Sequence, residues 1–570
     1  MPGIRPARNS GLGDWSFLRH WVLPGLLAFA ALFPSGCTPP PTRTSYGDRE
    51  QILFRGNGPE PQDVDPQIVI GDAEDHIVGA LFEGLVSEDP RDLHPLPGVA
   101  ESWDISQDGK VYTFHLRKNA RWSNGDRITA RDFVRSYARM LMPSLAADSA
   151  HMLYLVSNAA EFNTGKIADF SQVGFNALDE STLQVSLKTP ASYFLSLLNH
   201  HAWFPVPVPV IERCGPLDQR GNRWTRPENF VGNGPFVLAK WKINDVLQVK
   251  KSATYWDADR VKLKEIRFYP IESLDTEERA FRAGQLHVIH QAPVSKIDWF
   301  KRHHPELLRI DPSLGTYIYR LNVTRPPLND RRVRRALAMS VDREAIANQI
   351  SRGGEKPAYC FTPPGTAGYT SHARVPYDVE AARKLLTEAG YPNGRAFPRL
   401  TIIFNTLASH RAIAEAIQEM WKKNLNIDVT LENQEWKVFL ANLRTMNYQI
   451  GRGIWTADYV DPKSFLDLFL SNSGPNQTGW SNAEYDRLVT EGNESPDNQQ
   501  RYQLYQKAEA ILVDEAPMIP IYHRTVPFLI TPNVQGWFPT LTDHHPYKYV
   551  YLDPTKKASP GNPARTLAGP

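Results

Sequence analysis

The sequence predicts a mixed α/β fold built from several lobes. Strand and helix signals alternate along its 570 residues, 41% of the side chains are hydrophobic, and no repeat of fixed length is visible. At about 100–200 residues per domain, this length corresponds to about three to five domains or lobes. The apolar content is enough for large cores and excludes a largely disordered chain. The lack of repeats argues against a solenoid.

Three segments in the first part of the chain have clear patterns. Residues 110–117 and 183–187 alternate polar and apolar side chains with the period of two that half-buried strands show. Residues 330–339 instead carry apolar side chains at helical spacing, and an Asn-Asp pair supplies the start signal of that helix.

The same alternation continues toward the C-terminus. A helix is predicted at 380–389, closed by the glycine that follows it, and another at 501–513. A buried strand at 400–405 leads into a helix through 412–422, and a short apolar strand bounded by prolines is predicted at 517–522. Alternating strands and helices of this kind indicate mixed α/β lobes.

The charge balance excludes one large class of partners. Lys and Arg number 64 against 62 Asp and Glu, which gives a formal net charge of +2. Because a nucleic-acid binder needs a basic patch or stripe, no nucleic acid is expected as a partner. The 3 cysteines are too few for a disulfide-rich scaffold or a four-cysteine zinc site.

A search for catalytic and metal-binding motifs finds none. The chain has no G-x-S-x-G elbow, no H-E-x-x-H pair, no phosphate-binding P-loop and no EF-hand loop. Adjacent histidines occur at 200–201, 303–304 and 544–545, but neighbouring residues point in different directions on a helix or a strand. We therefore expect no metal, no cofactor and no enzyme activity, although a catalytic triad assembled in space would leave no motif.

The N-terminus has the pattern of a secretory signal. Arg5, Arg8 and Arg19 precede a short apolar run at 21–33, and small residues lead from it to Cys37. A membrane-spanning helix needs about 20 apolar residues, so a single anchoring helix is the weaker alternative. The small residues before Cys37 resemble the lipobox of bacterial lipoproteins, with a proline where leucine is usual. A lipidated Cys37 would tether the chain to a membrane, whereas an ordinary cleaved signal would not.

Ten short stretches, in one order over roughly residues 50–550, resemble a known family. They are NGPEPQDVDP at 57–66, LFEGL at 81–85, PGVAESW at 97–103, DGKVYTFHLR at 108–117, NGPF at 233–236, YWD at 255–257, VRRAL at 333–337, AGY at 389–391, NQEW at 433–436 and WTADY at 455–459. In this combination the chain resembles the peptide-binding proteins of bacterial ABC importers. These form the oligopeptide/dipeptide family of extracellular solute-binding proteins, and the oligopeptide-binding members look most similar.

The resemblance implies a two-lobe periplasmic-binding-protein fold with a hinge. Its parts would be a signal peptide at 1–36, a tether at 37–47, lobe I at 48–82, 208–314 and 523–553, an extra domain on lobe I at 83–207, lobe II at 315–522, and a disordered tail at 554–570. The two chain crossings near 314 and 522 would form the hinge, about which such proteins close on their ligand.

The resemblance also assigns residues to the N-terminal end of a bound peptide. Asp458 matches the family aspartate that pairs with the α-ammonium group of the peptide, a charge-assisted contact that fixes register. A solvated or helix-capping aspartate is the alternative. The preceding residues Ile454, Trp455, Thr456 and Ala457 would offer backbone groups to the peptide, as an added strand requires.

Three basic residues match positions that neutralise the C-terminal carboxylate at different peptide lengths: Arg452, His410 and Arg444. An ordinary surface cation is the alternative for each of them. A lysine that serves the same end in the family is replaced by Ser351, which leaves the preferred peptide length open.

Five residues match positions in side-chain pockets: Trp436, Leu440, His200, Gln291 and Arg320. For Trp436 the alternative is an ordinary core tryptophan. Arg320 stands where the family usually has a carboxylate, so we hypothesise that it shifts preference toward acidic side chains.

The cysteines separate this chain from some of its apparent relatives. Members in enteric bacteria pair two cysteines at positions that align here with Gly315 and Thr456, and both cysteines are absent. Cys214 and Cys360 remain, either as buried thiols or as a pair.

The resemblance implies a non-enzymatic, monomeric, lipid-anchored protein in the periplasm or at the cell exterior. It would capture short peptides between its lobes and deliver them to the permease and ATPase subunits of an ABC-type peptide importer. Two alternatives stay open. The same scaffold could hold nickel, a sugar, a murein peptide or a signalling peptide, or the chain could be a secreted hydrolase.

Overall fold

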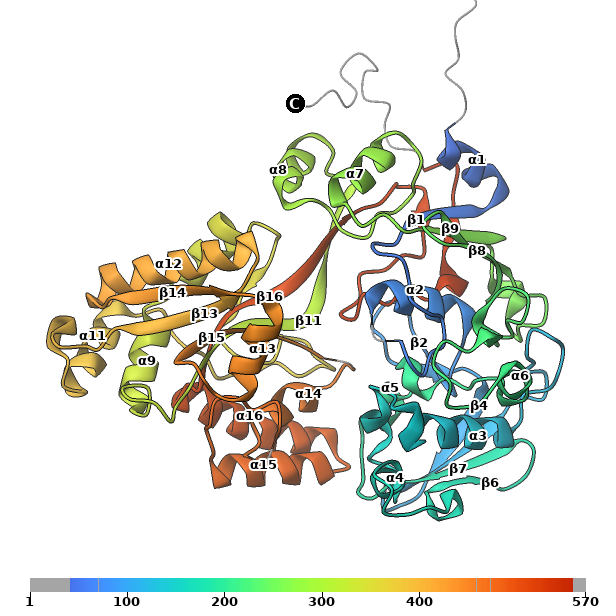
Figure 1. Ribbon diagram of the computed structural model, residues 1–570, viewed down its shortest axis with the longest axis horizontal. Helices are drawn as coiled ribbons and strands as arrows, with labels where there is room; N and C mark the ends of the chain where they lie inside the picture. Colours follow the sequence, from blue (N-terminus) through green and yellow to red (C-terminus); the bar gives the residue numbers. More distant parts are fainter. Residues whose placement is uncertain (1–41, 70, 458, 472, 557–570) are drawn as a thin grey trace, which may run out of the picture. The chain divides into compact units, whose positions relative to one another are not determined.

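Three larger β-sheets organise the computed structural model, which describes residues 42–556 except residues 70, 458 and 472 (Figure 1). The signal peptide, Cys37 and residues 557–570 of the predicted tail lie outside the described residues. No helix in the described part of the chain is long and apolar enough to cross a membrane.

The first sheet combines segments from both ends of the chain. Its four strands follow the order β1 (Ile52–Gly56), β10 (Glu265–Tyr269), β9 (Val246–Lys251) and β8 (Phe236–Lys242). β1 runs parallel to β10, and the other neighbours are antiparallel. The helices of this region are α2 (Asp72–Leu81), α7 (Leu274–Arg282) and α8 (Val294–His303).

The predicted tether is wrong for residues 43–47, which belong to helix α1 (Arg43–Glu50). The hydroxyl of Thr42 caps this helix by accepting from the backbone N–H of Ser45 at 3.2 Å. Gly47 is buried, and a Cβ there would overlap the rings of Phe54 and His287. The helix is therefore stabilised by capping and close packing rather than by an apolar stripe. For this reason its sequence has no hydrophobic periodicity that would predict a helix.

The second sheet is antiparallel and lies in residues 100–186. Its strands follow the order β4 (Ala100–Ile105), β5 (Val111–Leu116), β7 (Thr182–Ser186) and β6 (Phe175–Ala177), with α3 (Ala130–Met140), α4 (Ala159–Asn163), α5 (Phe194–Leu197) and α6 (Val208–Cys214) in the same region. β5 and β7 confirm the two strands predicted from alternation. Buried side chains of this sheet and of the first one, such as Phe114 and Leu53, belong to one continuous hydrophobic core.

The third sheet has six strands and lies in the C-terminal half. Its order is β12 (Lys356–Pro357), β16 (Met518–Leu529), β11 (Leu308–Leu321), β15 (Ile450–Thr456), β13 (Leu400–Asn405) and β14 (Val429–Gln434). The helices of this half are α9 (Arg331–Met339), α10 (Arg343–Ala345), α11 (Val379–Glu388), α12 (Ala408–Leu425), α13 (Trp436–Arg444), α14 (Lys463–Leu466), α15 (Ala483–Glu494) and α16 (Asn498–Glu515).

The two faces of this sheet bury different cores. Tyr317 and Tyr319 of β11 pack with α9, α11 and α12, whereas Leu314 and Ile318 pack with α15 and α16. The four helices predicted in this half are confirmed as α9, α11, α12 and α16. Gly390 has a φ of 96° just after α11, the left-handed conformation expected of a helix-terminating glycine.

β11 and β16 connect the cores. They pair antiparallel from Leu308↔Leu529 to Arg320↔Met518. The Leu529 end is buried in the core of the first two sheets, and the Tyr319 end in a core of the third. The predicted strand at 517–522 is therefore present but too short. Pro520 is tolerated because the register shifts beside it, which is where a sheet accepts a residue without an N–H.

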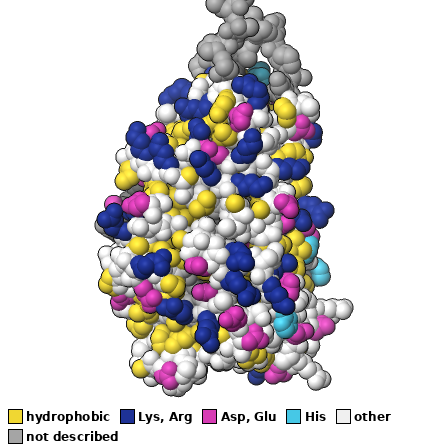
Figure 2. Space-filling model, turned by 90° about the vertical axis from the view of Figure 1, so that its right-hand side faces the viewer, with side chains coloured by type: hydrophobic (Ala, Val, Ile, Leu, Met, Phe, Trp, Pro, Cys, Tyr) yellow, Lys and Arg dark blue, Asp and Glu magenta, His cyan; other side chains and the backbone are white. Residues whose placement is uncertain are grey.

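Charged side chains of both signs are interspersed over the face shown in Figure 2. This face presents no single-sign field that would mark a binding surface by itself.

Candidate ligand-binding site

One edge of β15 is free where the sequence predicts peptide backbone contacts. β11 pairs with β15 along Ile450–Thr456, but β13 reaches only Ile450 and Gly451 on the other side. Among the described residues, no strand pairs with 452–456 on that side. Ile454, Trp455 and Thr456 lie on this stretch, and Ala457 follows it. Free N–H and C=O groups on a strand edge can bind an extended chain.

The position of Thr456 agrees with the alignment to cysteine-containing relatives. Gly315 and Thr456 are directly opposite each other in the β11–β15 pair. A Cβ on Gly315 would lie 3.2 Å from the hydroxyl oxygen of Thr456. A pair of cysteines at these two positions would thus be cross-strand neighbours. Cys214 and Cys360 are free, so the alternative in which they pair is wrong.

Two of the predicted carboxylate-binding residues meet in one buried cluster. Arg452 is 8% exposed and His410 is 6% exposed. The guanidinium carbon of Arg452 lies 5.1 Å from the centre of the Tyr317 ring. The hydroxyl of Tyr317 is hydrogen-bonded to Nδ1 of His410 at 3.2 Å. Tyr317 was not predicted, since its role depends on contacts that no local pattern encodes.

The electrostatics of this cluster favour an anion. Burial and the nearby charge of Arg452 lower the pKa of His410 to about 3, so the imidazole is neutral at physiological pH. Arg452 donates from Nη1 to Oδ1 of Asn405 at 3.3 Å, while its Nε has no partner among the described residues. No carboxylate in the described part of the chain forms an ion pair with Arg452. A buried cation without a counter-charge is a fitting partner for a carboxylate.

The other predicted residues of this region lie on or near helix α13. Trp436 is 50% exposed and stacks on Phe439 at 6.0 Å between ring centres, which excludes a core tryptophan. Leu440 packs against a small core that includes Phe439 and Leu443. Arg444 is exposed at the C-terminal end of the helix, and no contact among the described residues joins it to the Arg452 cluster.

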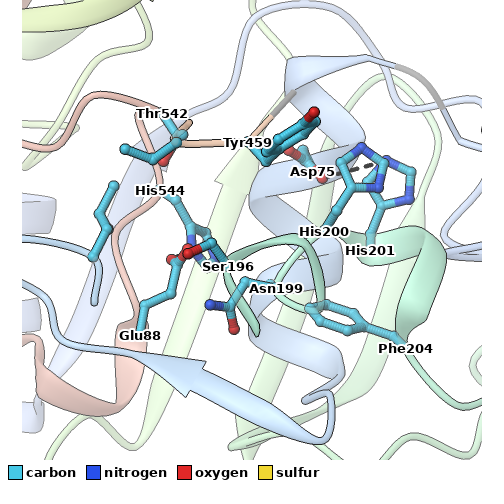
Figure 3. A pocket seen from close by; sticks show the side chains of 13 residues that line it. Asp75, Glu88, Ser196, Asn199, His200, His201, Phe204, Tyr459, Thr542 and His544 are labelled. Carbon is cyan, nitrogen blue, oxygen red and sulfur yellow. Dashed lines mark hydrogen bonds and ion pairs between the residues drawn. The ribbon is translucent and has the colours of Figure 1, made fainter. Parts of the chain in front are cut away.

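His200 lines a separate pocket of ≈ 60 Å³, which Figure 3 shows. Its Nδ1 accepts from the backbone N–H of Ala202 at 3.2 Å, and burial holds its pKa well below the usual value. Tyr459 and Val460 line the same pocket. His200 therefore lies near the segment that follows residue 458, but not in the Arg452 cluster. Figure 3 also labels the other lining residues Asp75, Glu88, Ser196, Asn199, His201, Phe204, Thr542 and His544.

A larger cavity of ≈ 590 Å³ adjoins the same segment. Trp455, Tyr459 and Lys463 line it from one side, and Tyr193 lines it from the other. The rings of Tyr193 and Tyr459 stack at 5.7 Å. No sequence signal marks Tyr193, because its partner is distant along the chain.

Two predicted residues are not placed in these sites. Gln291 is partly buried just before α8, and nothing described joins it to the β15 edge. Asp458 lies outside the described residues. Of its neighbours, Ala457 directly follows β15, and Tyr459 lines both cavities.

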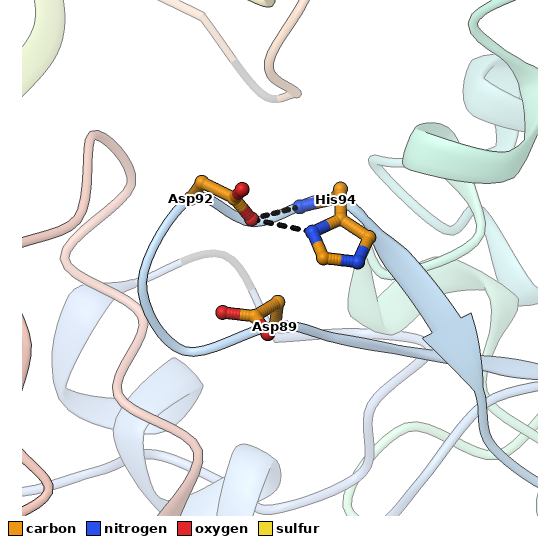
Figure 4. Close-up of side chains that lie close together, drawn as sticks. All are labelled: Asp89, Asp92 and His94. Atoms are coloured by element: carbon orange, nitrogen blue, oxygen red, sulfur yellow. Dashed lines mark hydrogen bonds and ion pairs between the residues drawn. The ribbon is translucent and has the colours of Figure 1, made fainter.

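One group of side chains has the composition of a cation site (Figure 4). Asp89, Asp92 and His94 lie in the turn between β2 (Val86–Glu88) and β3 (Pro95–Pro97). Asp92 already binds Nδ1 of His94 at 2.6 Å, and Asp89 binds the guanidinium of Arg91 at 2.9 Å. The turn is therefore stabilised by its own contacts, and we assign no metal to it.

These features define a class of protein. Two hydrophobic bodies joined by a strand pair, with cavities lined from both, form the periplasmic-binding-protein fold, a mixed α/β fold. The unliganded open form of the periplasmic murein tripeptide binding protein MppA superposes with a TM-score of 0.79 at 34% identity, covering 88% of this chain and 97% of that one. The predicted fold class is thus confirmed.

The chain belongs to the bacterial extracellular solute-binding proteins, family 5, whose middle region matches residues 94–477. It is 36% identical over 529 residues to the periplasmic oligopeptide-binding protein OppA of Escherichia coli, covering 90% of this chain and 93% of the relative. Haemophilus influenzae OppA in complex with RPPGFSPFR superposes with a TM-score of 0.69 at 34% identity, covering 88% and 99%. The family is non-enzymatic, which removes the secreted hydrolase as an alternative.

Proposed function

We propose that this protein is the peptide-binding component of an ABC-type importer. It captures short peptides and delivers them to the permease and ATPase subunits. The observation that carries the proposal is the free edge of β15 beside the buried, unpaired Arg452. The free strand edge would hydrogen-bond the backbone of an extended peptide, and Arg452 beside it would bind the peptide's C-terminal carboxylate.

The N-terminus of the peptide would meet Asp458. In the sequence, Asp458 follows directly on Ala457, so a peptide paired along 454–457 with its N-terminus at that end would bring its ammonium group to Asp458. An ammonium group taken out of water needs a counter-charge, and Asp458 would supply it.

The C-terminal carboxylate would bind Arg452, with neutral His410 as a hydrogen-bonding partner. Arg444 would serve a longer peptide from the end of α13. Trp436 and Leu440 would form one side-chain pocket, since an exposed aromatic ring accommodates many side chains. His200 and Gln291 would contact further side chains, with His200 in the pocket beside Tyr459.

The same proposal extends to the location of the protein, its oligomeric state and its closure on the ligand. The mature protein is extracytoplasmic, and a lipid on Cys37 would anchor it to the membrane after removal of residues 1–36. It would act as a monomer. Lobe II at 315–522 would close on the remainder about β11 and β16, the two strands that link the cores.

Native mass spectrometry of protein purified without denaturation tests the proposal. Peptide masses should co-purify with the wild-type protein and be released intact on unfolding. Recovery of only metal, sugar or lipid would contradict it.

A further inference from the structure

Seven arginine side chains are buried in the described part of the chain, and their partners differ. Three of them pair with carboxylates: Arg139 with Asp65, Arg334 with Glu515 and Arg501 with Asp461. Arg55 and Arg343 donate to a tyrosine hydroxyl and to backbone carbonyls. Arg452 has one long hydrogen bond to Asn405. The side chain of Arg320 forms no ion pair or hydrogen bond with any described residue.

The described surroundings of Arg320 leave space for its guanidinium group but contain no carboxylate that pairs with it. Arg320 lies on β11 directly opposite Gly451, and a side chain on Gly453 would overlap its guanidinium group. Gly453 thus leaves the space that the guanidinium occupies beside the free part of β15. Burial and the charge of Arg452 both lower the pKa of Arg320.

A mostly buried guanidinium without a counter-charge is costly, and a ligand carboxylate would supply the missing partner. Arg452 has a candidate ligand group in the peptide carboxylate. A second anionic group is needed for Arg320, and a peptide can supply it only from an acidic side chain.

Resting on the proposed function, we infer that Arg320 determines specificity by binding the side-chain carboxylate of the peptide. The ligand class is acidic peptides, in which an Asp or Glu side chain meets Arg320 while the backbone lies along β15. A charge-assisted contact in this desolvated position discriminates against the neutral amide, which leaves the guanidinium uncompensated.

Calorimetry with a matched tetrapeptide series tests the inference. Tetra-alanine is compared with peptides that carry one Glu, Gln or Lys at the second, third or fourth position. At one position, Glu should bind at least about tenfold more tightly than Gln, the size of one charge-assisted contact. Arg320→Gln should remove this preference for Glu over Gln, while Arg320→Lys should keep part of it.

Arg411→Gln is the control, because it removes an exposed cation from α12 and should keep the preference. Arg320→Met serves as a second variant if Arg320→Gln does not fold. Equal binding of Glu and Gln peptides by a protein that binds tetra-alanine would overturn the inference and leave the proposed function intact. A preference that survives in folded Arg320→Gln would also overturn it. Failure of every peptide to bind would overturn both.

Discussion

The guanidinium of Arg320 is mostly buried and has no counter-charge among the described residues, which predicts an unusual response to substitution. Arg320→Leu should raise the free energy of unfolding by about 1–3 kcal/mol, because it removes a buried charge that has no partner. Arg501→Leu should lower it by about 3–5 kcal/mol, because it leaves Asp461 buried and unpaired. Urea unfolding of both variants without ligand measures the difference. Destabilisation by both substitutions would show that Arg320 is compensated within the protein.

His410 predicts a pH dependence of stability. Its pKa is about 3 when folded and about 6.5 when unfolded, so below pH 6.5 the unfolded chain binds the extra proton. Stability should therefore fall as the pH drops from about 6.5 toward 3. Between pH 7 and 5, the free energy of unfolding should fall by about 2 kcal/mol less in His410→Gln than in wild type. Urea unfolding at each pH measures this difference. Parallel pH profiles for the two proteins would contradict this pKa.

The role of a residue can be predicted from sequence only when a local motif or a family resemblance marks it. Arg452 and His410 were assigned by resemblance, and the structure brings them together, whereas their partner Tyr317 was missed. The stacking of Tyr193 on Tyr459 joins residues far apart in sequence, so no window of sequence reveals it. Arg444 and Gln291 were assigned by the same resemblance, but no described contact connects them to the cluster.

At the scale of elements, sequence patterns succeeded where local chemistry decides. The side chain of Asp378 caps α11 just before its first residue, and Gly390 follows its last turn, so local sequence signals mark both ends. β16 was underestimated because its prolines resemble strand ends, although register shifts accommodate Pro520. α1 was missed because a cap and close packing, rather than an apolar stripe, stabilise it.

The register of β15 can be tested with an engineered disulfide. Gly315→Cys combined with Thr456→Cys should form a disulfide, because the two residues are directly opposite in the β11–β15 pair. Gly315→Cys with Trp455→Cys is the matched control, since adjacent strand residues point to opposite faces. Thiol titration of unfolded protein reports the outcome. Free thiols in the first variant, or a disulfide in the second, would mean that the register is different.

At the scale of the whole molecule, the long strands β11 and β16 are the connection about which we expect closure. A ligand stabilises the closed state only if it makes contacts there that it lacks in the open state, such as contacts with both cores at once. Small-angle scattering should show a smaller radius of gyration when peptide is added to wild type. Tyr193→Ala should reduce the change, because it removes a contact between the two bodies at Tyr459. An unchanged radius with saturating peptide would argue against hinge closure.

The central claim is that the protein recognises both charged ends of a short peptide, and calorimetry with blocked peptides tests it most directly. One peptide is measured in its free, N-acetylated and C-amidated forms against wild type, Asp458→Asn and Arg452→Gln. Acetylation and amidation should each weaken wild-type binding about 10–100-fold, the size of a lost charge-assisted contact. Acetylation should have little further effect in Asp458→Asn, and amidation little in Arg452→Gln. Blocked peptides that bind wild type as tightly as the free peptide would contradict the claim.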